Sequence, residues 1–321
     1  MPSCPSEHIK PEDLLVETLG ECRFPSPLGA KYFVNDEDRI SLTPYMRKLT
    51  DRIGRNETMP SFEPAGPRER IFFEPSEVTA GIVTCGGLCP GLNDVIRAIV
   101  IALERNYRVP RILGFRYGYA GLARSGGFEP MILNREVVDD IHQDGGTILG
   151  SSRGPREASE MVDRLVEEGV DMLFTVGGDG TLRGAQTIVD EIRRRGLSIA
   201  VVGVPKTIDN DIDLISKSFG FETAVTMSRS AIVAAHTEAK GAQRGIGLVK
   251  LMGRQSGFIA AAATLAHSEV NVCLVPEVDF RIDGEGGLIE YLERRLQNRR
   301  HAVVVVAEGA GQKYLEDGSG A

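Results

Sequence analysis

The stretch Phe174-Thr175-Val176-Gly177-Gly178-Asp179-Gly180-Thr181-Leu182-Arg183-Gly184-Ala185 places a glycine turn between two different apolar patterns. Five apolar or β-branched residues, 172–176, lead into the turn and predict a buried strand. After the turn, apolar side chains recur at helical spacing, at Leu182, Ala185, Ile188 and Ile192. The stretch therefore predicts a strand, a turn of the size that holds a phosphate, and a helix.

This turn has the chemistry of an anion-binding site. Backbone without a Cβ approaches an anion closely, and the start of a helix offers unpaired N–H groups and a favourable dipole. Asp179 would repel a phosphate there unless a cation accompanied it, so its carboxylate suggests Mg²⁺. The alternative is a tight turn in which Asp179 caps the helix.

The composition describes an ordinary globular chain. It has 321 residues, 42% of them hydrophobic and 26% charged, which is long enough for two domains. The formal charge of −8 argues against nucleic acid and anionic membranes as partners, and no stretch has the apolar length of a membrane span. The five cysteines are odd in number, and Cys85 and Cys89 flank glycines, which favours small turn residues over metal ligands. We expect a reduced, cytoplasmic protein.

A second unit of the same kind begins at residue 79. The apolar strand 79–84 meets three glycines, and a helical pattern follows from Leu92. Two such turns can face one polyphosphate. Further along, the glycine-rich segment 145–154 carries Arg153, whose guanidinium can hold two phosphate oxygens; alternatively, Arg153 is a surface charge.

Three aspartates at alternate positions, Asp209, Asp211 and Asp213, follow the predicted strand 199–204. Carboxylates at the end of a buried strand repel one another unless a metal or a hydroxyl intervenes. We therefore interpret Asp209 as a general base for a substrate hydroxyl, with Thr207 positioning the substrate and Asp211 on the metal side. The alternative is an Asp-rich turn at a helix N-terminus.

Strands alternate with amphipathic helices from residue 79 onward. This order predicts a mostly parallel α/β fold, with ligands at the carboxyl ends of the strands. We expect one domain over residues 79–221 and another over 222–321. Residues 1–78 are polar and rich in Pro, Asp and Glu, and we expect an N-terminal extension wrapped over a core.

Four segments, in this order, carry a resemblance to a known family. They are Gly86-Gly87-Leu88-Cys89-Pro90-Gly91-Leu92-Asn93, Gly177-Gly178-Asp179-Gly180-Thr181, Pro205-Lys206-Thr207-Ile208-Asp209-Asn210-Asp211 and Met252-Gly253-Arg254. The ordered set closely resembles the phosphofructokinase family from Gly81 to Gly311. Phe33-Val34-Asn35-Asp36 further resembles its plant-like and protist branch. The resemblance implies two Rossmann-like three-layer domains with mostly parallel sheets, the first for nucleotide and the second, incomplete here, for sugar phosphate.

The resemblance also implies an activity and a set of roles. The activity is transfer of a phosphoryl group from Mg-ATP to the 1-hydroxyl of fructose 6-phosphate, a step of glycolysis. Asp209 would be the catalytic base, and Asp179 and Asp211 would hold Mg²⁺. The donor would be surrounded by Gly87, Arg153, Gly178, Asp179, Gly180 and Thr181. The sugar phosphate would be bound by Lys206, Thr207, Asp209, Met252, Gly253, Arg254 and Glu308.

Two residues bear on the phosphoryl donor. In this family, Gly at the position of Gly180 leaves room for the inner phosphate of a nucleotide, whereas pyrophosphate users carry an Asp there. Lys206 points the other way, because pyrophosphate users share a Lys before Thr-Ile-Asp. The combination resembles the plant-like ATP enzymes, so we expect ATP, with pyrophosphate as the alternative.

Two other readings stay open. NAD kinases and diacylglycerol-type lipid kinases resemble the Gly-Gly-Asp-Gly-Thr turn, although they are not expected to carry the later motifs. The family continues past the strand that ends at Glu308, so a non-catalytic or regulatory chain is the second reading. Family membership implies a homo-oligomer, a dimer or tetramer, or assembly with a full-length homologue.

Overall fold

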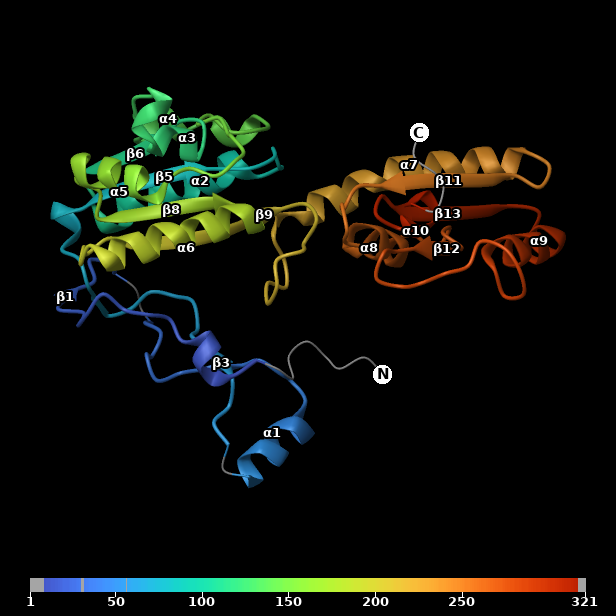
Figure 1. Ribbon diagram of the computed structural model, residues 1–321, viewed down its shortest axis with the longest axis horizontal. Helices are drawn as coiled ribbons and strands as arrows, with labels where there is room; N and C mark the ends of the chain where they lie inside the picture. The colour runs from blue at the N-terminus through green and yellow to red at the C-terminus, as the bar shows by residue number, and fades with distance from the viewer. Residues whose placement is uncertain (1–8, 30–31, 56, 317–321) are drawn as a thin grey trace.

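Two separate sheets lie side by side in the computed structural model, which describes residues 9–29, 32–55 and 57–316. The long helix α7 (Phe221–Gly241) leads from the first sheet and runs along the second (Figure 1). Among the helices of the described ranges, none combines the length and the apolar character needed to cross a membrane.

The first sheet has the strand order β10-β9-β8-β5-β6-β7. Its strands are β5 (Thr79–Thr84), β6 (Arg111–Phe115), β7 (Met131–Ile132), β8 (Met172–Gly177), β9 (Ala200–Thr207) and β10 (Phe219–Gly220). All pairings are parallel except that of β7 with β6. Thr84 pairs with Val176 and Val176 with Val204, so β5, β8 and β9 direct their carboxyl ends to one edge.

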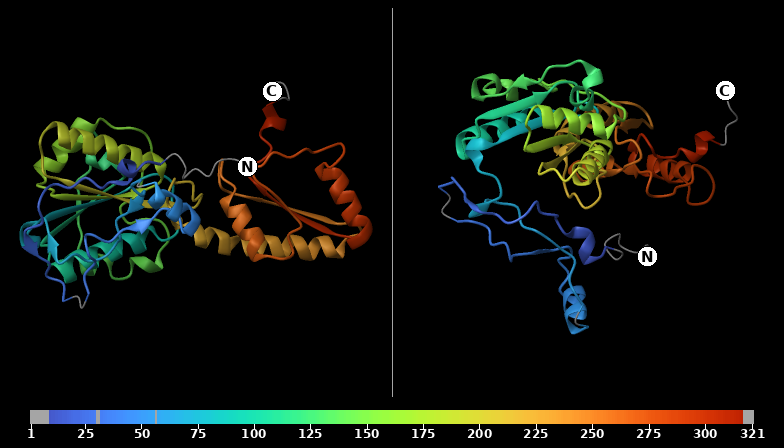
Figure 2. Two further views of the ribbon diagram at one scale, coloured as in Figure 1. Left: turned by 90° about the horizontal axis from the view of Figure 1, so that it is seen from below. Right: turned by 60° about the vertical axis from the view of Figure 1, so that its left-hand side comes forward.

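Helices cover both faces of this sheet, as Figure 2 shows. They are α2 (Leu92–Ile101), which continues as a π-helical segment to Tyr107, α3 (Tyr119–Leu122), α4 (Arg135–Val138), α5 (Ala158–Glu167) and α6 (Asp179–Arg194). In β5, Ile82 packs into the core under α2, and the next residue, Val83, packs into the core under α5 and α6. This alternation is typical of a strand buried on both faces. The predicted α/β class with mostly parallel sheets is confirmed.

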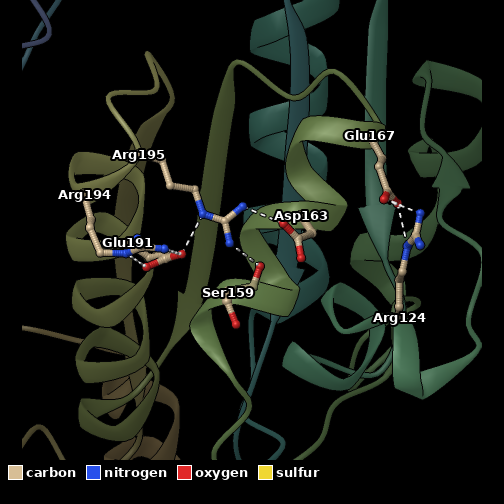
Figure 3. Close-up of polar contacts among 7 residues, drawn as sticks. All are labelled: Arg124, Ser159, Asp163, Glu167, Glu191, Arg194 and Arg195. Carbon is tan, nitrogen blue, oxygen red and sulfur yellow. Dashed lines mark hydrogen bonds and ion pairs between the residues drawn. The ribbon is translucent and has the colours of Figure 1, made fainter.

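Ion pairs fasten α6 to α5 at the end of α6 that lies away from the glycine turn (Figure 3). Arg195 reaches from the end of α6 to Asp163 at 2.5 Å and donates to the Ser159 carbonyl oxygen at 3.0 Å. Hydrogen bonds from Arg194 and Arg195 lower the pKa of Glu191 to about 2. Exposed pairs of this kind stabilise a fold only modestly, but together they fix how α6 lies on its neighbour.

The second sheet has the order β11-β13-β12, and both pairings are parallel. Its elements are β11 (Ile246–Leu251), α8 (Phe258–Ala266), β12 (Val272–Leu274), α9 (Leu288–Arg299), β13 (Ala302–Ala307) and α10 (Lys313–Glu316). Helices α7 and α8 pack on one face, and α9 packs on the other face over β12 and β13. Strand β11 is buried on one face only, since its residues alternate between exposed and buried and Leu248 is 68% exposed.

The segment before β5 forms two short antiparallel ribbons and a helix. They are β1 (Phe24–Pro25) with β4 (Arg70–Ile71), β2 (Ile40–Ser41) with β3 (Ser61–Phe62), and α1 (Met46–Gly54). Phe73 packs against the core of the first sheet, and Glu17 pairs with Arg193. However, α1 buries no residue and projects away from both sheets in Figures 1 and 2. The expectation of an extension wrapped over a core is therefore wrong for α1.

A close contact joins the start of α7 to the first glycine turn. Gly220, the residue before α7, has a φ of +103°, and a Cβ there would lie 1.9 Å from the Cys89 sulfur. The Cys89 thiol donates to the Phe219 carbonyl oxygen at 3.1 Å. Cys89 thus acts as a small residue at a close backbone approach, as its sequence context indicates.

We predict that Gly220→Ala destabilises the fold by about 1–3 kcal/mol more than Gly196→Ala, because only the former overpacks a neighbour. Gly196 also has a positive φ, +66°, but a Cβ there meets nothing within 4 Å. Chemical denaturation measures both losses. In a Cys89→Ala background the excess cost of Gly220→Ala should shrink, and an undiminished cost there would contradict the assigned contact.

Candidate active site

The carboxyl ends of β5, β8 and β9 bring the predicted turns together. A Cβ at Gly178 would lie 3.5 Å from the Lys206 carbonyl oxygen and 3.8 Å from the Thr207 Cβ. The glycine-rich loop joins from the other side, since Gly86 donates its N–H to the Ser152 carbonyl oxygen at 3.0 Å. Three segments that are far apart in the sequence therefore meet at one edge of the sheet.

The residues predicted for the phosphoryl donor lie on these turns. A Cβ at Gly87 would come within 3.2 Å of the Arg153 guanidinium. Thr181 is buried in the first turn of α6, and its carbonyl oxygen accepts a hydrogen bond from the Tyr119 hydroxyl at 2.6 Å. A Cβ at Gly180 meets nothing within 4 Å, so packing alone does not require glycine there. That position is open to a ligand.

Lys206 is a buried link rather than a surface cation. It is only 3% exposed, and its ammonium donates to the Gly87 carbonyl oxygen at 2.7 Å. Burial lowers its pKa, opposed by the neighbouring thiols of Cys89 and Cys85. The side chain therefore ties the end of β9 to the first glycine turn while keeping a cation beneath the predicted donor site.

Asp209 is the buried carboxylate of the site, 6% exposed. Burial raises its pKa, the nearby Asp211 raises it further, and Arg254 opposes the rise. The Arg254 Nε atom lies 3.6 Å from an Asp209 carboxylate oxygen. A carboxylate held in this way is more basic than an exposed one while keeping a partner for its charge.

The loop that carries Asp209 is held by Asn210. Its backbone has a φ of +54°, a conformation that Asn tolerates better than most residues. Its side chain accepts from the Ser218 N–H at 2.8 Å and donates to the Ser216 carbonyl oxygen at 3.2 Å. The Ser218 hydroxyl donates to the Thr207 carbonyl oxygen at 2.6 Å. These bonds hold the two ends of the loop together, with its three aspartates between Thr207 and Ser218.

Lys206, Thr207 and Asp209 lie at the end of the first sheet, and the second sheet supplies the other residues predicted for the sugar phosphate. Leu251 pairs with Ala307, so Met252 and Glu308 follow neighbouring strands at the same edge. Met252 is 63% exposed, and the Arg254 side chain is 66% exposed where it approaches Asp209. The structure thus brings Arg254 to Asp209 and leaves Met252 facing solvent.

The predicted metal ligands are oxygen donors on two neighbouring turns. Asp179 is paired with Arg183 one helical turn along α6, and Asp211 is exposed. Across the described ranges, no group of three or more His, Cys, Asp or Glu side chains gathers at a metal-binding distance. Two carboxylates completed by substrate phosphates are the usual donor set for Mg²⁺, so the residues fit that ion only together with a nucleotide.

Sequence reasoning missed the supporting polar side chains. No role was predicted for Asn210 or Ser218, although Asn adopts a positive φ more readily than most residues. Ser256 donates to the Asp209 carbonyl oxygen at 3.0 Å from 47 residues away. Nothing in the local sequence around Ser256 indicates that contact.

Comparisons with known proteins identify the family of the chain. The family model described as Phosphofructokinase matches residues 79–319. The chain is similar to an ATP-dependent 6-phosphofructokinase of Borreliella burgdorferi, 49% identical over 317 residues, which cover 95% of this chain and 70% of that protein. It is also similar to an ATP-dependent 6-phosphofructokinase of Trypanosoma cruzi, 47% identical over 324 residues, 99% of this chain and 66% of that protein. The solved phosphofructokinase of Saccharomyces cerevisiae superposes with a TM-score of 0.62 at 26% identity, over 73% of this chain and 34% of that one.

We predict that Asn210→Ala destabilises the protein by about 1–3 kcal/mol, because it removes buried hydrogen bonds and strains a positive φ. Asn210→Gly loses the same bonds without the strain, and should be less harmful by roughly 1 kcal/mol. Denaturant titration measures both variants. Equal losses would mean that the backbone conformation contributes nothing to the cost.

A second prediction concerns the pKa of Asp209 in the metal-free protein. Removing the charge of Asp211 as Asp211→Asn should lower that pKa, because a nearby negative charge favours the protonated carboxyl. Carboxyl ¹³C NMR titration of Asp209 measures the change. Asp213→Asn, in the same loop, is the control and should leave the pKa of Asp209 unchanged. An equal shift of that pKa in both variants would refute the effect assigned to the charge of Asp211.

Proposed function

The chain belongs to the phosphofructokinase family, and from that premise we propose that it transfers a phosphoryl group from ATP to the 1-hydroxyl of fructose 6-phosphate. The observation that carries the proposal is the buried Asp209, which lies between the glycine turns of one sheet and Arg254 of the other. The chain spans 66% and 70% of the length of the two curated relatives compared, so the activity of this chain is the point to be tested.

Asp209 acts as the general base in this proposal. Its carboxylate takes the proton of the sugar hydroxyl as the oxygen attacks phosphorus, and the raised pKa makes it a better acceptor. Arg254 lies beside the same carboxylate, so its guanidinium is placed to hold the sugar phosphate close to the base. Activity should therefore rise with pH as Asp209 loses its proton.

The glycine turns hold the donor. The open position at Gly180 leaves room for the inner phosphate of a nucleotide, and Arg153 beside Gly87 can bind phosphate oxygens. Asp179 and Asp211 would hold Mg²⁺ against the donor. When bound, this ion neutralises charge on the transferring phosphoryl group. Both relatives compared are named ATP-dependent, which supports ATP over pyrophosphate.

Pyrophosphate is the second candidate donor, and one observation favours it. The ammonium of Lys206 is buried at the first glycine turn, where it offers a fixed positive charge to a compact diphosphate.

A chain that binds nucleotide without turnover is the third reading. Homo-oligomer formation and a cytoplasmic location stay predictions.

We predict that purified protein with Mg²⁺ and fructose 6-phosphate forms fructose 1,6-bisphosphate faster with ATP than with pyrophosphate. Asp209→Ala should lower kcat on the order of 10²–10⁴-fold, the usual contribution of a general base. A coupled assay of fructose 1,6-bisphosphate measures both. Asp213→Ala, an exposed carboxylate of the same loop, is the matched control and should retain its rate.

Two outcomes would redirect the assignment. Faster turnover with pyrophosphate would make Lys206, rather than Gly180, the residue that selects the donor. No product with either donor, from folded protein that still binds ATP, would leave a nucleotide-binding chain without catalysis.

A further inference from the structure

Ser256 connects the two halves of the site through the backbone of Asp209. It lies in the turn between β11 and α8 and is 6% exposed. Its hydroxyl donates to the Asp209 carbonyl oxygen at 3.0 Å and accepts from the Phe258 N–H, in the first turn of α8, at 3.4 Å. A buried hydroxyl from the second sheet therefore holds the backbone of a residue that belongs to the first.

The backbone of Asp209 depends on side chains for its orientation. Its N–H donates to the Thr207 hydroxyl at 3.1 Å, and its carbonyl oxygen accepts from Ser256. Strand β9 ends at Thr207, so the sheet does not fix Asp209. The two side chains thus determine which way its peptide groups, and hence its carboxylate, are turned.

The turn that carries Ser256 is itself tightly fixed to the second sheet. The Ser256 N–H donates to the Gly253 carbonyl oxygen at 2.9 Å, and the Gly257 N–H donates to the Glu277 carboxylate at 2.8 Å. A Cβ at Gly309 would lie 2.1 Å from the Arg254 carbonyl oxygen, so the end of β13 packs directly on this turn. A hydroxyl anchored in this way transmits the position of the second sheet to Asp209.

We propose that Ser256 is a positioning residue that sets the placement of the Asp209 carboxylate relative to Arg254. The inference rests on the proposed function, because Asp209 is the base of that reaction. A misplacement of about 1 Å in a reacting group can cost on the order of 10²-fold in rate. Loss of the Ser256 hydroxyl can therefore lower kcat measurably.

The kinetic test compares two buried serines. Ser256→Ala should lower kcat on the order of 10-fold to 100-fold, with the KM for ATP unchanged. Ser228→Ala is the control: Ser228 is also 6% exposed and loses one hydroxyl bond, to the Val225 carbonyl oxygen at 2.6 Å within α7. Its kcat should stay within about twofold of the wild type, as a structural change of this size leaves the site in place.

A double-mutant cycle separates positioning from a general structural effect. The Ser256 contact is to backbone and survives in Asp209→Ala, but there it has no carboxylate to position. Ser256→Ala should therefore cost nothing further in that background. An equal loss of rate with and without the Asp209 carboxylate would overturn the proposal.

Hydrogen exchange tests the contact without any turnover. The amides of residues 208–211 should exchange about fivefold faster in Ser256→Ala, the change expected for one lost hydrogen bond, and at the wild-type rate in Ser228→Ala. Unchanged exchange in Ser256→Ala would overturn the inference. Absence of product from the wild-type chain would count against the proposed reaction alone, and the exchange measurement would still decide whether Ser256 holds the loop.

Discussion

The parallel register of β5, β8 and β9 is the constraint on which the whole site depends. Because Thr84, Val176 and Val204 lie opposite one another, the two glycine turns and the aspartate loop emerge at one edge of the sheet. Side chains in a strand alternate between faces, so a shift by one residue would send the side chains that pack under α2 to the face covered by α5 and α6, and the reverse, and neither core would fit. The same burial that stabilises the sheet therefore fixes the chemical groups at its end.

The second sheet repeats this arrangement and approaches the first around Asp209. The pairing of β11 with β13 places Met252 and Glu308 at the ends of neighbouring strands, and α7 leads from the first sheet to the second. Asp209 is reached from both sides: Thr207 and Asn210 hold its loop on the first sheet, and Arg254 approaches from the second. The surroundings of Asp209 are thus defined by the junction of the sheets and not by either sheet alone.

The sequence was informative where structure is local. Apolar periodicity located β5, β8 and α6 to within a few residues, because strand and helix patterns are set by neighbours along the chain. The exposure of Leu248 was not predictable, since the local sequence of β11 does not show whether elements distant in the chain cover one face or two. The contact of Ser256 with Asp209 was equally hidden, because it depends on how two sheets dock. Asn210 was predictable only in part. Its residue type indicated a positive φ, but nothing in the neighbouring sequence indicated its bonds to Ser218.

The packing of Cys89 against Gly220 has a consequence for the reactivity of the protein. The thiol is 4% exposed, and burial raises its pKa to about 11, so little thiolate exists at neutral pH and reagents have little access to the sulfur. Alkylation of Cys89 requires the start of α7 to separate from the first glycine turn. Because Gly220 belongs to β10, the rate of that modification reports how often the edge of the first sheet separates from the first glycine turn. The chain already contains the residue that reports it.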